Sequence, residues 1–214
     1  MAGDVYNEGI SRITPDDIAV ARRLGYVVKL LAICERIDGP AGTNDFSVAV
    51  RVHPTMVPKD HPLASVRDSY NAVFVEGGAV GNLMFYGRGA GGRPTASAVL
   101  GDLIDAAVNL RQGTHGPMGS FTRARMRPID ETSAEYYLPL EVVDRPGVLH
   151  AVTGAFAKHD VSIRSMEQEG HGDEAQLVFI THEAREADVQ ATLRDLRDLE
   201  VVKRVGGLLR VVGA

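Results

Sequence analysis

The residues best suited to binding chemistry form a short turn at 144–149, with the sequence Asp-Arg-Pro-Gly-Val-Leu. A strand-like run at 136–143 precedes the turn, and a helix-like run at 148–159 follows it. Backbone N–H groups at a helix start favour a carboxylate, and Gly147 leaves room for a small ligand. Asp144 is expected to cap this helix, and Pro146 suits its first turn. The turn therefore predicts a small-ligand site, with an ordinary strand-to-helix turn as the alternative.

A second candidate is the glycine-rich segment at 87–92, Gly-Arg-Gly-Ala-Gly-Gly, which follows a predicted strand and precedes a predicted helix. Its spacing matches G-x-G-x-x-G. However, no parallel strand follows the helix, and no acidic residue ends such a strand about 20 positions on, so a complete dinucleotide-binding unit is not indicated. The glycines would instead let the backbone approach a cofactor that is bound mainly by other parts of a protein. A flexible crossover without a ligand is the alternative.

The first part of the chain is predicted to contain two helices and several strands. Thr14 is expected to cap the first helix and Gly25 to end it. The Gly77-Gly78 pair is expected to turn a hairpin. The predicted elements are a helix to about residue 24, strands at 26–34 and 46–53, a proline-rich loop at 54–62, strands at 72–76 and 82–86, and a helix at 94–110 with packed faces.

The second part has the order strand, helix, strand, strand, helix, strand, which is the ferredoxin-like βαββαβ arrangement. The expected strands are 136–143, 161–169, 175–182 and 201–212, with the last one broken at Gly206-Gly207. The inward side chains are expected to be Tyr136, Leu138, Leu140 and Val142 on the first strand, and Leu149, Val152 and Phe156 on the first helix. Both helices would cover one sheet face, so a second copy is expected to cover the other. The predicted fold class is α+β.

Composition excludes several classes of protein. Apolar residues make up 44% of the 214 residues and charged residues 24%, as in a globular protein. A net charge of −5 argues against nucleic-acid binding, and no apolar window is long enough for a membrane span. The single cysteine, Cys34, lies in an apolar run and is expected to be a buried thiol in a reducing, cytoplasmic compartment. No metal site is predicted, because the histidines lack ligand spacing.

Two resemblances follow from these motifs. The turn at 144–149, in its βαββαβ context, resembles the ACT domain, a regulatory module that binds free amino acids. The segments 4–10, 24–32, 61–66, 71–73 and 86–99 resemble, in that order, the second half of bacterial homoserine dehydrogenase of the longer form that ends in an ACT domain. The stretch Gly-Ala-Gly-Gly-Arg-Pro-Thr-Ala-Ser-Ala-Val at 89–99 is its most specific part.

The resemblance implies three regions: part of the catalytic and substrate domain at 1–111, a linker at 112–134 and an ACT domain at 135–214. It implies interconversion of aspartate semialdehyde and homoserine with NADP or NAD. Its Rossmann unit and its catalytic Asp and Lys are not found in this sequence. The chain alone is therefore expected to be inactive, with no cofactor bound. The implied cofactor-binding residues are Gly87, Gly89, Ala90, Gly91 and Gly92. Glu8 is a candidate ligand for the substrate ammonium, with a solvated acid at a strand end as the alternative.

The same resemblance implies an amino-acid site made of Asp144, Arg145, Pro146, Gly147, Val148 and Leu149, with Ser162 and Ile163 facing them across a dimer interface. Asp144 would accept the ligand ammonium if it does not cap the helix. L-Threonine is the expected ligand, although another small amino acid is possible. A homodimer or tetramer is expected through both sheets. The alternatives are a stand-alone amino-acid-binding regulator and a module that only builds oligomers.

Overall fold

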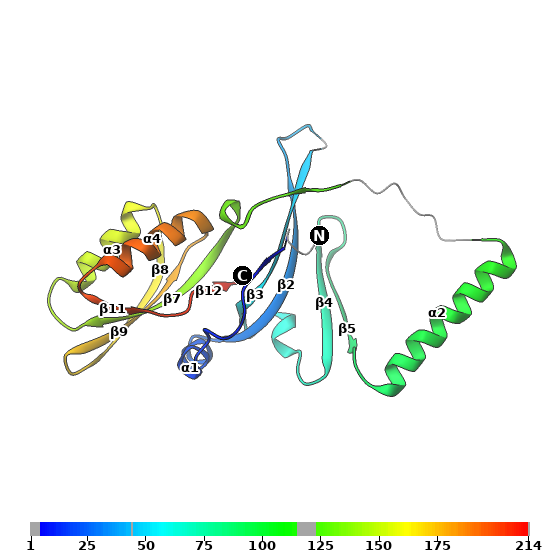
Figure 1. Cartoon of the computed structure of the whole chain (residues 1–214), viewed down its shortest axis with the longest axis horizontal. Coiled ribbons are helices and arrows are strands. Elements are labelled where there is room, and N and C mark those ends of the chain that lie inside the picture. The colour runs from blue at the N-terminus through cyan, green and yellow to red at the C-terminus, as the bar shows by residue number, and fades with distance from the viewer. Residues whose placement is uncertain (1–4, 44, 115–122, 214) are drawn as a thin grey trace. The chain divides into compact units, whose positions relative to one another are not determined.

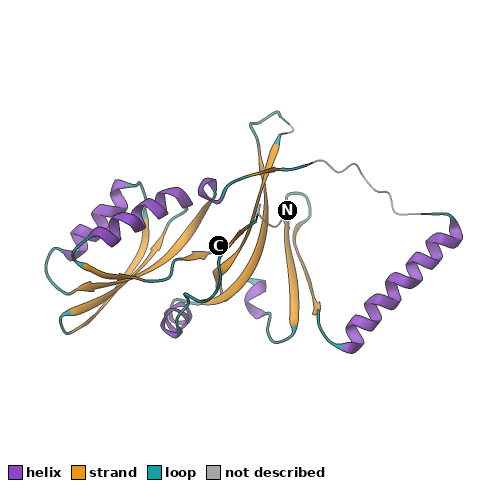
Figure 2. Ribbon diagram, viewed as in Figure 1, coloured by secondary structure: helices purple, strands orange, loops and turns teal. Residues whose placement is uncertain are grey.

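The structure is a computed structural model that describes residues 5–43, 45–114 and 123–213, without the side chain of His171. It divides into two compact units, one made of Met1–Pro58 with Ala124–Ala214 and the other of Lys59–Arg123. Figures 1 and 2 show mixed helices and strands, which confirms the α+β class. The proposed domain bounds 1–111, 112–134 and 135–214 stay a prediction.

The ferredoxin-like arrangement is present in the larger unit. Its elements are β7 (Ser133–Val143), α3 (Val148–Lys158), β8 (Ile163–His171), β9 (Glu174–Thr181), α4 (Glu186–Asp198) and β11 (Val202–Val205). The strand order is β11-β7-β9-β8, and each neighbouring pair is antiparallel. A short β10 (Ala184–Arg185) also pairs with β7. The predicted closing strand is split, as expected at the glycine pair, into β11 and β12 (Leu209–Val211).

Helices α3 and α4 pack on one face of this sheet and enclose the main core (Figure 2). The four predicted side chains of β7 are buried there, and so are Val152 and Phe156 of α3. The prediction for Leu149 was wrong, because its side chain is 37% exposed. The helix begins at Val148, so the inward stripe is Val148, Val152, Ala155 and Phe156, with helical spacing.

The opposite sheet face is partly covered within the same chain. Helix α1 (Pro15–Arg23) contributes Val20 and Ala21 to a second core that contains Tyr137 and Val178 of the sheet. The Tyr137 hydroxyl also donates to Asp17 Oδ1 of α1 at 3.2 Å. The expectation that a second copy covers this face was therefore wrong for the part around Tyr137 and Val178, which α1 covers. It failed because the pattern of one domain does not show what a distant segment covers.

The sheet continues into the N-terminal segment. Strand β3 (Phe46–Pro58) pairs antiparallel with β2 (Tyr26–Asp38) and parallel with β1 (Tyr6–Asn7), β6 (Arg125–Met126) and β12. The predicted loop at 54–62 was wrong up to Pro58, because Thr55 and Met56 pair with β12 and are buried.

Strand β12 joins the two halves of the sheet, because it also pairs antiparallel with β7 (Figure 1). Short 3-10 helices lie at Pro62–Ser65 and Ile129–Glu131. Cys34 is exposed rather than buried, because alternate residues of β2 face away from the core.

The smaller unit contains the predicted hairpin, formed by β4 (Tyr70–Gly77) and β5 (Gly81–Arg88), and the predicted helix, α2 (Gly92–Gln112). The packed faces expected on this helix are not found, since no residue of α2 is buried in the described structure. Leu100 and Ile104, for example, are more than half exposed. Among the described residues, no helix is long and apolar enough to cross a membrane.

Candidate functional site

The turn at 144–149 is built by a positive backbone angle at Gly147. Gly147 has φ of 90° and is the N-cap of α3, and no side chain caps the helix. The predicted cap by Asp144 was therefore wrong, and Pro146 lies before the helix rather than in its first turn. Because the reversal occurs at Gly147, the helix begins three residues later than a cap at Asp144 would require. The first-turn N–H groups are left without a side-chain acceptor.

Asp144 is held by the β8–β9 hairpin instead. Its backbone N–H donates to the Asp173 carbonyl at 2.9 Å. Its carboxylate lies against Gly170, where an added Cβ would be 2.8 Å from Oδ2. The remaining turn residues, Arg145, Pro146, Gly147 and Leu149, are exposed, while Val148 is buried. The turn thus contains an exposed carboxylate at Asp144 and, three residues later, a helix start whose N-cap glycine has no capping side chain. A carboxylate and helix N–H groups are complementary to the two ends of an amino acid.

Ser162 and Ile163 lie at the other end of the sheet. Val143, just before the turn, pairs with Glu174, whereas Ile163 pairs with Thr181 at the far end of β9. The seven residue-to-residue steps from Glu174 to Thr181, at about 3.4 Å each, separate the two positions by about 24 Å. One chain therefore does not bring these two groups of predicted residues together.

The glycine-rich segment joins β5 to α2 and is exposed from Gly87 to Gly92. At two of these positions the local structure itself requires glycine. Gly91 is the N-cap of α2 with φ of 128°, and a Cβ at Gly89 would lie 2.2 Å from Asn71 Nδ2. Nothing lies within 4 Å of a Cβ at Gly87 or Gly92, so the backbone there is open to approach.

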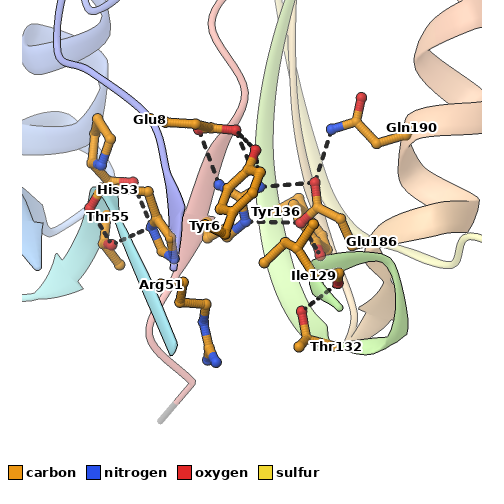
Figure 3. Close-up of polar contacts among 12 residues, drawn as sticks. Tyr6, Glu8, Arg51, His53, Thr55, Ile129, Thr132, Tyr136, Glu186 and Gln190 are labelled. Carbon is orange, nitrogen blue, oxygen red and sulfur yellow. Dashed lines mark hydrogen bonds and ion pairs between the residues drawn. The ribbon is translucent and has the colours of Figure 1, made fainter. Parts of the chain in front are cut away.

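Glu8 belongs to a buried ionic cluster that the sequence reasoning missed (Figure 3). Its centre is Arg210 of β12, whose side chain is 3% exposed. Arg210 Nε and Nη2 donate to the two carboxylate oxygens of Glu186, each at 2.8 Å. Arg210 Nη1 and Nη2 donate to Glu8 Oε2 and Oε1 at 3.1 and 3.3 Å. One guanidinium therefore binds two carboxylates from opposite ends of the chain.

Neighbouring groups complete this cluster. Tyr136 donates to Glu186 Oε2 at 3.0 Å, and Gln190 donates to Glu186 Oε1 at 2.8 Å. The Tyr6 hydroxyl donates to Glu8. Burial raises the pKa of Glu8, but hydrogen bonds from Arg210 and Tyr6 outweigh burial and hold that pKa below its ordinary value. The one sequence signal was Arg210 itself, a charge inside the apolar run at 208–212.

A cleft of about 390 Å³ lies beside Tyr6, lined by β1, β3 and residues of the segment that leads into β7. Arg51 and Arg127 contribute the cationic groups of its lining. Arg51 Nη1 is paired with Glu35 at 3.0 Å, and Arg127 Nε donates to Ser47 at 3.1 Å. The charge of Arg51 is therefore paired within the protein, whereas the Arg127 guanidinium bonds a neutral hydroxyl.

The βαββαβ fold of the larger unit is that of a class of small regulatory domains, and residues 136–201 match the family model of the ACT domain. Residues 1–104 match the homoserine dehydrogenase family model. The chain corresponds to the C-terminal part of homoserine dehydrogenase, with the end of the homoserine dehydrogenase domain followed by an ACT domain.

Individual relatives agree with this assignment. Homoserine dehydrogenase of Mycobacterium leprae is 48% identical over 99% of the chain, and that of Corynebacterium glutamicum is 46% identical over 98%. The crystal structure of a homoserine dehydrogenase from Thiobacillus denitrificans matches 99% of the chain with a TM-score of 0.88 and 32% identity, and covers 48% of that protein. The chain spans 49% of the M. leprae relative and 47% of the C. glutamicum relative, which is about half of each.

Proposed function

We propose that the chain supplies the C-terminal half of a homoserine dehydrogenase that interconverts aspartate semialdehyde and homoserine with NADP or NAD. The two family matches, in this order along one chain, carry the proposal. The exposed glycines at 87, 89, 91 and 92, with Ala90, would approach the nicotinamide end of the cofactor. Their lack of side chains is the supporting observation. The 214-residue chain alone is expected not to oxidise NADPH, because it lacks the family's catalytic Asp and Lys.

Glu8 is proposed to bind the substrate ammonium. Its side chain is 33% exposed, so one part of the carboxylate stays accessible while Arg210 and Tyr6 orient the rest. A carboxylate has about four lone-pair directions, so these donors do not exhaust it.

The ACT domain is proposed to regulate the enzyme by binding L-threonine. Two observations carry this part: Asp144 is exposed and its carboxylate is not used as a cap, and Gly147 at the start of α3 provides no capping side chain. The helix start would receive the ligand carboxylate and Asp144 its ammonium. Arg145, Pro146, Gly147, Val148 and Leu149 would form the wall of this site. Ser162 and Ile163 would come from a second copy in a homodimer or tetramer, and Ser162 would bond the threonine hydroxyl.

Titration calorimetry of the chain with threonine, isoleucine, methionine and homoserine tests this regulation. Threonine is expected to release heat. Asp144→Asn is expected to weaken threonine binding at least tenfold, because it removes a charge-assisted bond worth about 1.5–3 kcal/mol. Asp198→Asn, an exposed change at the end of α4, is the matched control and should leave binding unchanged. Absence of heat from all four amino acids would leave the ACT domain a structural dimerisation module.

A further inference from the structure

The cluster around Arg210 connects the ACT domain with the segment that carries Glu8. We propose that Arg210 is a positioning residue through which strand β12 and helix α4 of the ACT region hold the Glu8 carboxylate in its orientation. The functional meaning of that orientation rests on the proposed role of Glu8 as the substrate-ammonium ligand. The geometry that supports the inference does not depend on that role.

The first argument is the position of Arg210 in the sheet. Arg210 pairs with Thr55 of β3 on one side and with Tyr136 of β7 on the other. Glu8 is attached to the same sheet, because its N–H donates to the Val52 carbonyl of β3 at 2.8 Å. Arg210 therefore stands at the seam between the two halves of the sheet, 202 residues from its partner Glu8.

The second argument is the rigidity of the guanidinium. Its plane is set by the two-pronged contact with Glu186, whose side chain is 1% exposed. Glu186 is itself fixed by Tyr136, by Gln190 and by its backbone N–H, which donates to the Thr132 carbonyl at 2.9 Å. The N–H groups that remain on the planar fork then point in fixed directions. Glu8 accepts hydrogen bonds from these groups, so Arg210, which is held by Glu186 of α4, fixes the position of the Glu8 carboxylate.

The third argument is the charge of the cluster. Arg210 carries one positive charge, while Glu186 and Glu8 carry two negative charges, so the trio retains one negative charge. Glu186 is buried, and the only partly exposed member of the trio is Glu8. A second cation is therefore favoured at Glu8, which agrees with an ammonium ligand there.

Two readouts on the ligand-free chain test the inference. The first is the pKa of the Glu8 carboxylate, followed by NMR of the chain with ¹³C-labelled glutamate, with Glu8→Gln assigning the signal. The second is amide hydrogen exchange of the peptide that contains Tyr6 and Glu8. In Arg210→Lys, the Glu8 pKa should rise and exchange of this peptide should accelerate at least tenfold. Peptides from α3 and β9 should change less than twofold.

Glu186→Gln is the decisive second variant, because it leaves Arg210 and Glu8 chemically intact. It should also shift the Glu8 signal and accelerate amide exchange in the peptide that contains Tyr6 and Glu8. If Arg210→Lys does not fold, Glu186→Gln alone tests the inference. Arg204→Lys changes an exposed ion pair between Arg204 of β11 and Glu141 of β7, and it should alter neither readout. An unshifted Glu8 signal with unchanged exchange in folded Glu186→Gln would overturn the inference. No amino acid is present, so the outcome is independent of the threonine titration.

Discussion

At the scale of single residues, His53 has an environment that should make the protein sensitive to acid. It is 1% exposed, with Nδ1 3.2 Å from the Pro54 carbonyl and 2.9 Å from Thr55 Oγ1. Its Nε2 is buried and has no partner among the described residues. Burial, followed by the nearby charge of Arg210, lowers the pKa of His53 to about 4, and Arg51 and Glu8 also act on it. The imidazole is therefore neutral at neutral pH.

This pKa predicts a loss of stability at mildly acidic pH. The unfolded chain takes up the proton near pH 6.5, whereas the folded chain resists it until about pH 4. The stability present above pH 6.5 should therefore fall by roughly 3 kcal/mol as the pH drops from 6.5 to 4. The free energy of unfolding, measured with urea between pH 6.5 and 4, should depend less steeply on pH in His53→Gln than in the parent chain. His150→Gln, an exposed change, should follow the parent. Equal pH dependence in His53→Gln would contradict the assignment.

At the scale of elements, α1 is held by a local cap and by a long-range contact at the same residue. Thr14 Oγ1 accepts from the Asp17 N–H at 3.1 Å, and Asp17 Oδ2 accepts from the Thr14 N–H at 2.9 Å. The other oxygen of Asp17 accepts from Tyr137 in the sheet. The cap therefore also orients the carboxylate that attaches α1 to the ACT sheet.

Loss of this cap should destabilise the larger unit. Thr14→Ala is expected to lower the free energy of unfolding by about 1 kcal/mol, because the Asp17 N–H loses its side-chain acceptor. The measurement is the midpoint of urea unfolding at constant pH. Thr153→Ala is the matched control within α3, where the hydroxyl bonds the Leu149 and His150 carbonyls of the preceding turn. That change should be neutral or slightly stabilising, since alanine is the better helix former. Equal losses in both variants would argue against the cap.

The elements that sequence reasoning predicted well are those with local signals. Thr14, Pro15 and Gly25 bound α1, and the βαββαβ order follows from alternating apolar patterns and turn residues. The errors concern contacts between distant segments. Pairing of Thr55 and Met56 with β12 overrides two prolines that suggested a loop.

The candidate site shows the same division. Gly147 was singled out as the point where a small ligand approaches; the structure shows a positive φ there, and its role in binding stays a prediction. The fixation of Asp144 by the β8–β9 hairpin, and of Glu8 by Arg210, depends on tertiary contacts that no local pattern encodes.

At the scale of the whole molecule, about 24 Å separates the turn from Ser162 within one chain. A threonine site that contains both Asp144 and Ser162 would therefore need two chains. Asp144→Asn and Ser162→Ala would each damage both sites of a homodimer. A heterodimer of the two variants would instead carry one doubly damaged site and one intact site. In an equal mixture that exchanges freely, about a quarter of all sites should regain the parent affinity, since about half of the dimers are mixed.

Calorimetry before and after subunit exchange measures this recovery, and sedimentation velocity reports whether dimers are present. A mixture of the same variant with itself is the control and should recover nothing. A site contained in one chain would give no recovery on mixing, which would exclude the two-chain arrangement.

The division of the last strand has a consequence for chimeric enzymes. Strand β11 completes the sheet of the ACT domain, but β12 pairs with both β7 and β3 and carries Arg210. A foreign ACT domain that replaces the chain only as far as Val205 would keep the original β12. A replacement that extends through Val211 would remove it. The exchange would keep Arg210 but remove its partner Glu186, so the incoming domain would need a carboxylate at the matching position of its second helix.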